Sequence, residues 1–261
     1  MTPITDVNCF IGAYPFRHVP HPEPDVLVRV LEREGVHGAW VGHLPSAFHR
    51  DPRHGNDALY RALEPHREVL HPVPTIRPDW PAWEEQLREA EAQAAPGVRA
   101  YPPQWGLSPD DERMRELASR CAELGLVLIL TTRFEDLRQR HRMDTAGDLT
   151  AAAVRAIARS GAGAEILVTS AGADLIKEIH WGLTPDERTR ISYDIAWVWG
   201  PPEDHLAELL RTIGAAHFVF GSGWPLRLVQ TPRANLDLLP DDLREVALLS
   251  GGALTGRAKG A

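Results

Sequence analysis

The stretch FVFGSGWP, residues 218–225, decides the fold of this 261-residue chain. A short apolar run ends in Gly221-Ser222-Gly223, and a tryptophan and a proline follow. The apolar run suits a strand with both faces buried, whereas glycines let the backbone turn tightly and approach a ligand closely. The stretch therefore predicts a buried strand whose carboxyl end opens into a loop built for close approach.

Outward from this stretch, apolar runs alternate with amphipathic ones along the chain. Strands are expected at residues 4–11, 38–42, 69–76, 98–101, 126–130, 166–168, 191–195 and 218–220. Strict alternation of strands and helices indicates a parallel sheet, and eight such pairs in a chain of this length favour a closed barrel. No Gly-rich phosphate fingerprint follows the first strand, which argues against an open, doubly wound sheet. We predict the α/β class, with a single (β/α)8 TIM barrel domain over residues 1–261.

Helical patterns fill the intervals between these strands. They include residues 25–34, 150–160 and a last helix at about 241–249. The clearest boundaries belong to the helix that Ser108 is expected to cap, with Pro109 in its first position, Asp111 in a capping box and Gly125 after its end.

The composition narrows the possible partners. Acidic residues outnumber basic ones by 36 to 28, which argues against nucleic acid but leaves room for a small anion in a locally positive pocket. No apolar run is long enough to span a bilayer, no signal peptide is visible, and two distant cysteines suggest no disulfide framework. We expect a cytoplasmic protein with no membrane partner, and a homo-oligomer remains open.

Three segments carry a resemblance to a known family. They are DVNCFIG at 6–12, GVRAYP at 97–102 and FVFGSGWP at 218–225. In this order and spacing they resemble the amidohydrolase-related proteins of the amidohydrolase superfamily, whose first strand reads D-x-H-x-H-x-G and whose last reads F-G-S-D-aromatic-P. The resemblance implies a metal-dependent hydrolase-like TIM barrel with its active site at the carboxyl ends of the strands.

The same resemblance implies a degenerate metal site. The family's ligand positions fall on Asn8, Phe10, Thr132 or Arg133, Thr169 or Ser170, and Gly223. Asparagine is a poor zinc ligand, and phenylalanine and glycine offer no ligating side chain. We therefore expect no metal and no other cofactor. The family includes metal-free lactonases, so catalysis can survive this loss, although those enzymes keep the aspartate that Gly223 replaces.

Arginines are prominent at the expected strand ends. Arg99 ends the fourth strand, Arg133 ends the fifth, and Arg17 lies in the first loop. A guanidinium group binds a carboxylate through two parallel hydrogen bonds, so three converging arginines would favour a carboxylated substrate. The alternative is that they pair with Asp6, Glu135, Asp136 or Asp194 and only brace loops.

Other polar strand-end residues are candidates for catalysis. Asp194 can act as a general base or orient an arginine, and His43 can move a proton near neutral pH. Asn8 and Ser170 would orient the substrate. Each of these side chains can equally serve only in structural hydrogen bonds.

Aromatic residues lie near the same ends. Tyr101, Trp197 and Trp224 can wall a pocket for a ring, or simply fill the core. Residues 133–142 are dense in charge and read as a solvated loop whose first residues form part of a lid.

These patterns favour a metal-independent hydrolase or lyase that acts on a small carboxylated substrate of cyclic or aromatic type. One alternative is a non-catalytic barrel that binds a small ligand or a protein partner. Another is a metal-dependent hydrolase with a metal site rebuilt from Asp6, His43 and Asp194.

Overall fold

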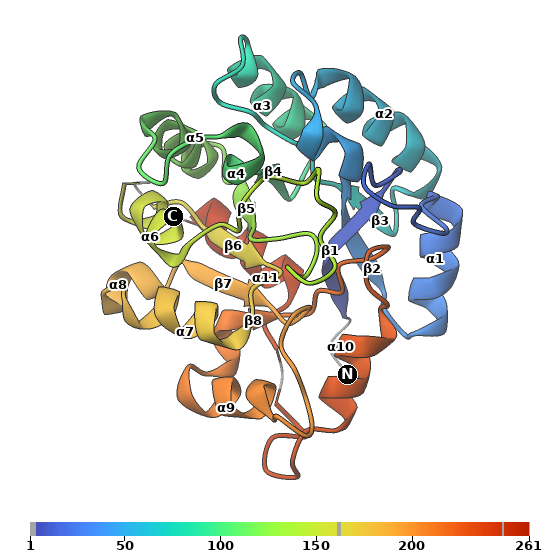
Figure 1. The fold of residues 1–261 in the computed structure, drawn as a ribbon, viewed down its shortest axis with the longest axis vertical. Coiled ribbons are helices and arrows are strands. Elements are labelled where there is room, and N and C mark those ends of the chain that lie inside the picture. Colours follow the sequence, from blue (N-terminus) through green and yellow to red (C-terminus); the bar gives the residue numbers. More distant parts are fainter. Residues whose placement is uncertain (1–3, 161–162, 247, 261) are drawn as a thin grey trace.

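The computed structural model describes residues 4–160, 163–246 and 248–260 (Figure 1). Within them, all eight predicted strands are present, and every ladder between neighbours is parallel. In chain order they are β1 (Thr5–Ile11), β2 (Gly38–His43), β3 (Leu70–Pro72), β4 (Gly97–Ala100), β5 (Val127–Thr131), β6 (Ile166–Thr169), β7 (Ile191–Asp194) and β8 (Phe218–Val219). The apolar runs of the sequence therefore mark the strands correctly.

The strands follow one another around a barrel in two ladders, β1–β3 and β4–β8. Single parallel bridges join the ladders, Thr75 to Arg99 on one side and Cys9 to Trp224 on the other. The ladder stops early in β3 because Pro72 and Pro74 carry no N–H to donate, so the strand is shorter than predicted. Strand order and parallel pairing are those of a (β/α)8 barrel, and the predicted fold class is confirmed.

Helices surround the strands on the outside (Figure 1). In chain order they are α1 (Pro24–Arg33), α2 (Arg53–Leu63), α3 (Trp83–Ala92), α4 (Pro102–Trp105), α5 (Glu112–Glu123), α6 (Ala151–Ser160), α7 (Ala173–Trp181), α8 (Pro185–Arg188), α9 (His205–Thr212), α10 (Gln230–Asp237) and α11 (Gly251–Gly260). Across the described parts of the chain, none of these helices has the length and apolar character needed to cross a membrane.

Two predicted helix boundaries are wrong. Residues 241–246 form turns instead of the expected helix, and residue 247 lies outside the described residues. Further along, Leu249 forms a parallel bridge with Val219 and its N–H donates to Phe218 O at 2.8 Å, which holds that segment extended. At α5 the cap is Asp111, which accepts a hydrogen bond from the Arg113 N–H at 3.0 Å, and not Ser108.

One end of the barrel is closed by α11, which crosses behind the strands in Figure 1. Leu254 and Ala258 of α11 pack into an apolar cluster inside the barrel, the floor cluster, whose other members are Val7, Trp40, Val73, Val127, Ile129, Leu167 and Val219. Arg257 Nη2 donates to Ser192 Oγ at 2.6 Å and lies 3.2 Å from Glu165 Oε2. With this end of the barrel covered by α11, the opposite end, where the strands reach their carboxyl termini, is the expected place for a ligand.

Candidate active site

A β-bulge in β1 shapes the centre of the site. The pairing with β2 advances three residues from Asp6 to Cys9 but only two from Ala39 to Val41, so Val7 and Asn8 stand opposite Trp40 together. Val7 belongs to the floor cluster, and Asn8 contacts Asp194 above it. The extra residue thus directs both side chains into the barrel, as bulges near functional sites commonly do.

Asp194, at the end of β7, is the centre of a buried hydrogen-bond group. Asn8 Nδ2 donates to Asp194 Oδ2 at 2.6 Å and is 3.3 Å from Ser170 Oγ. The backbone N–H of Ser170 donates to Asp194 Oδ1 at 2.9 Å. Ser170 has a φ of 62°, a left-handed conformation that is rare without glycine and that turns up where geometry is constrained by function.

The protonation of Asp194 is set by this environment. Burial raises the pKa of Asp194 to about 7, although the hydrogen bonds from Ser170 and Asn8 act in the opposite direction. A carboxyl group with a pKa near neutrality can both accept and donate a proton at physiological pH. Asp194 therefore has the chemical character of a general acid or base.

Two glycines of the FGSG stretch define the space beside this group. A Cβ atom on Gly221 would stand 2.7 Å from Asp194 Cβ and 3.1 Å from Asn8 Cβ, so no side chain fits there. Gly223, at the family's aspartate position, has a φ of 78°, and a Cβ atom there would meet only the Arg227 side chain, at an ordinary contact distance of 3.7 Å from Cδ. The missing side chain at Gly223 thus leaves room over the strand ends.

That room is a small hollow of about 200 Å3, counted up to its open side. It is lined by Phe10, Arg133, Phe134, Ser170, Trp197, Gly223, Leu226 and Arg227. Because Ser170 also binds Asp194, the hollow lies directly over the buried hydrogen-bond group. The hollow has no interior space for even a water-sized sphere in this structure, so rim side chains must move before a ring can enter.

Two arginines line the hollow. Arg133 lies 5.6 Å from the centre of the Trp197 ring and forms an ion pair with Asp148 at 3.2 Å. Arg227, which the sequence reasoning missed, lies 4.3 Å from the same ring. Its only signal in the sequence is its position four residues after Gly223, in the loop that follows the last strand.

Arg99 does not reach the hollow. Its side chain is fully buried, with its guanidinium carbon 4.4 Å from the centre of the Phe10 ring. Nη1 donates to Thr131 Oγ1 at 3.1 Å and Nη2 to Val7 O at 3.2 Å. Arg99 is an internal cation inside the barrel, and the structure gives it no contact with the open space.

Several other predicted residues also lie away from the hollow. Arg17 pairs with Glu135 at 2.8 Å and braces loops, which was the alternative reading of its role. His43 Nδ1 lies 2.8 Å from Ser46 Oγ, and burial lowers the pKa of His43 to about 4. Tyr101 is buried against Phe134, and Trp224 lies on the seam between β8 and β1.

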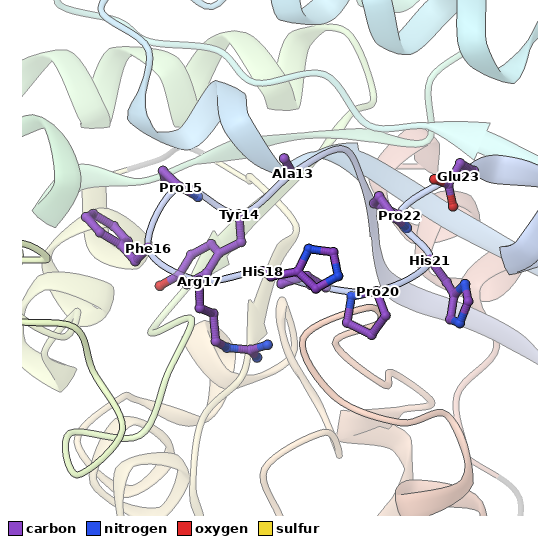
Figure 2. A pocket seen from close by; sticks show the side chains of 11 residues that line it. Ala13, Tyr14, Pro15, Phe16, Arg17, His18, Pro20, His21, Pro22 and Glu23 are labelled. Atoms are coloured by element: carbon purple, nitrogen blue, oxygen red, sulfur yellow. The ribbon is translucent and has the colours of Figure 1, made fainter.

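A larger hollow, of about 1,220 Å3 up to its open side, is formed by residues 13–23 alone. Figure 2 shows that the side chains of Arg17, His18 and His21 are spread along this loop and do not point toward one shared centre. The loop therefore lacks the convergent polar groups of a catalytic site.

The donor set does not fit the metal that the family resemblance implies. Both Asp194 oxygens already accept hydrogen bonds from N–H groups, and the neighbouring side chains are amide, hydroxyl and aromatic. In residues 4–160, 163–246 and 248–260, no three His, Cys, Asp or Glu side chains are placed to hold a metal ion. The alternative site of Asp6, His43 and Asp194 is thus not assembled.

Fold and site together define a (β/α)8 TIM barrel, and the expected resemblance to amidohydrolase-related proteins extends to solved structures that share this fold. A crystal structure of 2,6-dihydroxybenzoate decarboxylase with 2,6-dihydroxybenzoate matches 98% of this chain and 100% of its own, with a TM-score of 0.70 at 13% identity. A TIM-barrel protein from Bordetella bronchiseptica matches 98% and 99%, with a TM-score of 0.69 at 14% identity.

An amidohydrolase from Mycobacterium avium subsp. paratuberculosis matches 90% of this chain and 74% of its own, with a TM-score of 0.61 at 18% identity. No protein-family model matches the chain, and comparison with curated proteins by sequence gives no match. At these identities the likeness concerns the fold.

Proposed function

We propose that this barrel is a metal-independent hydrolase or lyase that acts on a small carboxylated substrate of cyclic or aromatic type. One observation carries the proposal: a buried aspartate with a pKa of about 7 lies beneath a hollow lined by arginine and aromatic side chains. The fold is shared with a decarboxylase crystallised with a dihydroxybenzoate, which supports a substrate of this class.

Each group has a role that follows from its position. Arg133 contributes positive charge at the side of the hollow where the substrate carboxylate binds, and the Trp197 ring packs against an apolar or aromatic body. Asn8 and Ser170 hold Asp194 and orient the reacting group. Protonated Asp194 donates a proton to a carbon or to a leaving oxygen, whereas ionised Asp194 accepts one from water.

The reaction is tested by Asp194→Asn in protein kept in chelator throughout. Turnover of hydroxybenzoates and small lactones should fall at least about a hundredfold, because the amide cannot exchange the proton. Asp242→Asn, at an exposed surface pair with Arg211, is the matched control and should keep full activity. Undiminished turnover in the Asp194 variant, or turnover that appears only with added metal, would contradict the proposal.

A non-catalytic barrel is the second candidate, and the small size of the hollow is the observation that favours it. It is supported if the same acids bind but none is converted. The cytoplasmic location and the homo-oligomer stay predictions, which cell fractionation and light scattering can check.

A further inference from the structure

Arg227 is a half-buried cation with an unsatisfied donor. Its backbone N–H bonds Gly223 O at 3.2 Å, which closes one turn after β8 and carries the side chain over the hollow. Its Nε is buried and has no hydrogen-bond partner. The Nε atoms of Arg99, Arg133, Arg140 and Arg257 are also unpaired, but the other nitrogens of these arginines donate to internal acceptors or lie in ion pairs. Buried donors are usually satisfied in native proteins, so Arg227, which has no such pair, is the arginine suited to an acceptor that enters from outside.

The charges around Arg227 also indicate that it binds an anionic acceptor from outside the chain. Arg227 and Arg133 both lie against Trp197, so their guanidinium carbons are within about 10 Å of each other. Arg133 forms an ion pair with Asp148, which also pairs with Arg140, whereas among the described residues no acidic side chain is within ion-pair distance of Arg227. Burial lowers the pKa of Arg227, because its charged form has lost solvent without gaining a counter-ion.

The aromatic surroundings limit what the acceptor can be. The Arg227 guanidinium carbon lies 4.3 Å from the Trp197 ring centre and 5.4 Å from that of Trp199, so two indoles hold its position. Trp197 and Phe134 also line the hollow and offer flat apolar surface to a ring. The hollow is closed to a ring in this structure, so any ligand requires the rim to open, and a single ring or short chain requires the smallest opening.

We propose that Arg227 is the principal anion-binding residue of this site and selects monocarboxylates that carry a single ring or a short chain. The carboxylate accepts hydrogen bonds from the Arg227 guanidinium, and the ring lies along Trp197 with its far edge over Ser170 and Asp194. Among the described lining residues, Arg227 is the one guanidinium without an ion pair, so it serves one carboxylate and a second would be left without such a partner. This inference rests on the proposed function and deepens it by naming the class of acid.

The test is binding of benzoate and phthalate to the full chain, measured by calorimetry and by tryptophan fluorescence. Wild-type protein should bind benzoate more tightly than phthalate. Arg227→Met keeps the aliphatic stem but removes the charge, and should weaken benzoate binding roughly tenfold to a hundredfold. Arg188→Met is the matched control, because Arg188 also lies over a tryptophan, 4.8 Å from the Trp181 ring centre, and lines no part of the hollow.

Each outcome decides something different. The inference is overturned if wild type does not bind benzoate or binds phthalate more tightly. It is also overturned if folded Arg227→Met keeps its benzoate affinity, or if the Arg188 control loses as much affinity as Arg227→Met. If Arg227→Met loses benzoate while wild type and Asp194→Asn turn over nothing, the anion site stands and the enzymatic proposal fails. If wild type turns over acids and Arg227→Met binds them equally well, the enzymatic proposal stands and the anion site fails.

Discussion

The two ends of this barrel differ in whether their buried charged groups have partners of opposite charge. At the closed end, Glu165 is buried but forms an ion pair with Arg257, and the floor cluster beside it is apolar. At the open end, Asp194 is buried with only neutral hydrogen-bond partners, and among the described residues no acidic side chain forms an ion pair with Arg227. A fold built only for stability would resemble the closed end throughout, so the uncompensated groups mark where this chain meets a ligand.

The largest effect on stability is expected at the closed end. Leu254 of α11 is fully buried in the floor cluster, so Leu254→Ala should lower the free energy of unfolding by about 2–5 kcal/mol. Leu137→Ala removes the same atoms from a side chain that is 76% exposed, so it should change the free energy of unfolding little. Urea unfolding measures both. Equal effects would show that α11 does not seal the barrel.

An intermediate effect on stability is expected from alanine substitutions of the two glycines in the FGSG stretch. Alanine is disfavoured by a steric clash at Gly221 and by the backbone conformation at Gly223. Gly221→Ala places a methyl group 2.7 Å from Asp194 Cβ, so it should cost about 1–3 kcal/mol and reduce turnover. Gly223→Ala touches only the Arg227 side chain, at an ordinary contact distance, and costs about 1 kcal/mol through its positive φ. Denaturant melts and activity assays separate the two. The comparison fails if Gly223→Ala impairs turnover more than Gly221→Ala does.

The smallest effect concerns the pH dependence of stability. Burial raises the pKa of Asp194 from 3.8 to about 7, so the folded chain holds a proton that the unfolded chain releases. Stability from this group is present below about pH 4 and is lost as the pH rises toward 7. Asp194→Asn should flatten the slope across this window and exceed wild type at pH 8 by at least about 1 kcal/mol.

Melting temperatures from pH 4 to 8 check this. The remaining slope should belong to other buried carboxyl groups, such as Asp6, whose pKa burial also raises. An unchanged slope in the variant would mean that Asp194 is ionised in the folded state across this range.

Much of this architecture could be read from local patterns. Apolar runs between helical segments located all eight strands, because burial on both faces demands them. The prediction of a helix at 241–249 was wrong because Leu249 pairs with Val219, which is distant in the sequence. Local helix propensity cannot indicate such a contact.

The site was accessible from sequence only in part. The rule that strand ends carry the chemistry brought Asn8, Ser170, Asp194, Arg133 and Trp197 to one place. It did not reveal that the Phe10 ring stands between Arg99 and the mouth, because the depth of a side chain depends on what packs above it. Arg227 was not predicted as a site residue because it follows the last strand by several residues, and the conformation of a loop leaves no periodic pattern in the sequence.

The extra residue in β1 sets which side chains of this strand point into the barrel and which point out. Downstream of it, every side chain of β1 points to the side that simple alternation would assign to its neighbour. Deleting Val7 would restore plain alternation and shift Asn8 relative to Asp194 without changing any residue that contacts the hollow. Insertion and deletion, more than substitution, are therefore the changes by which a barrel of this kind can gain or lose a polar group at its centre.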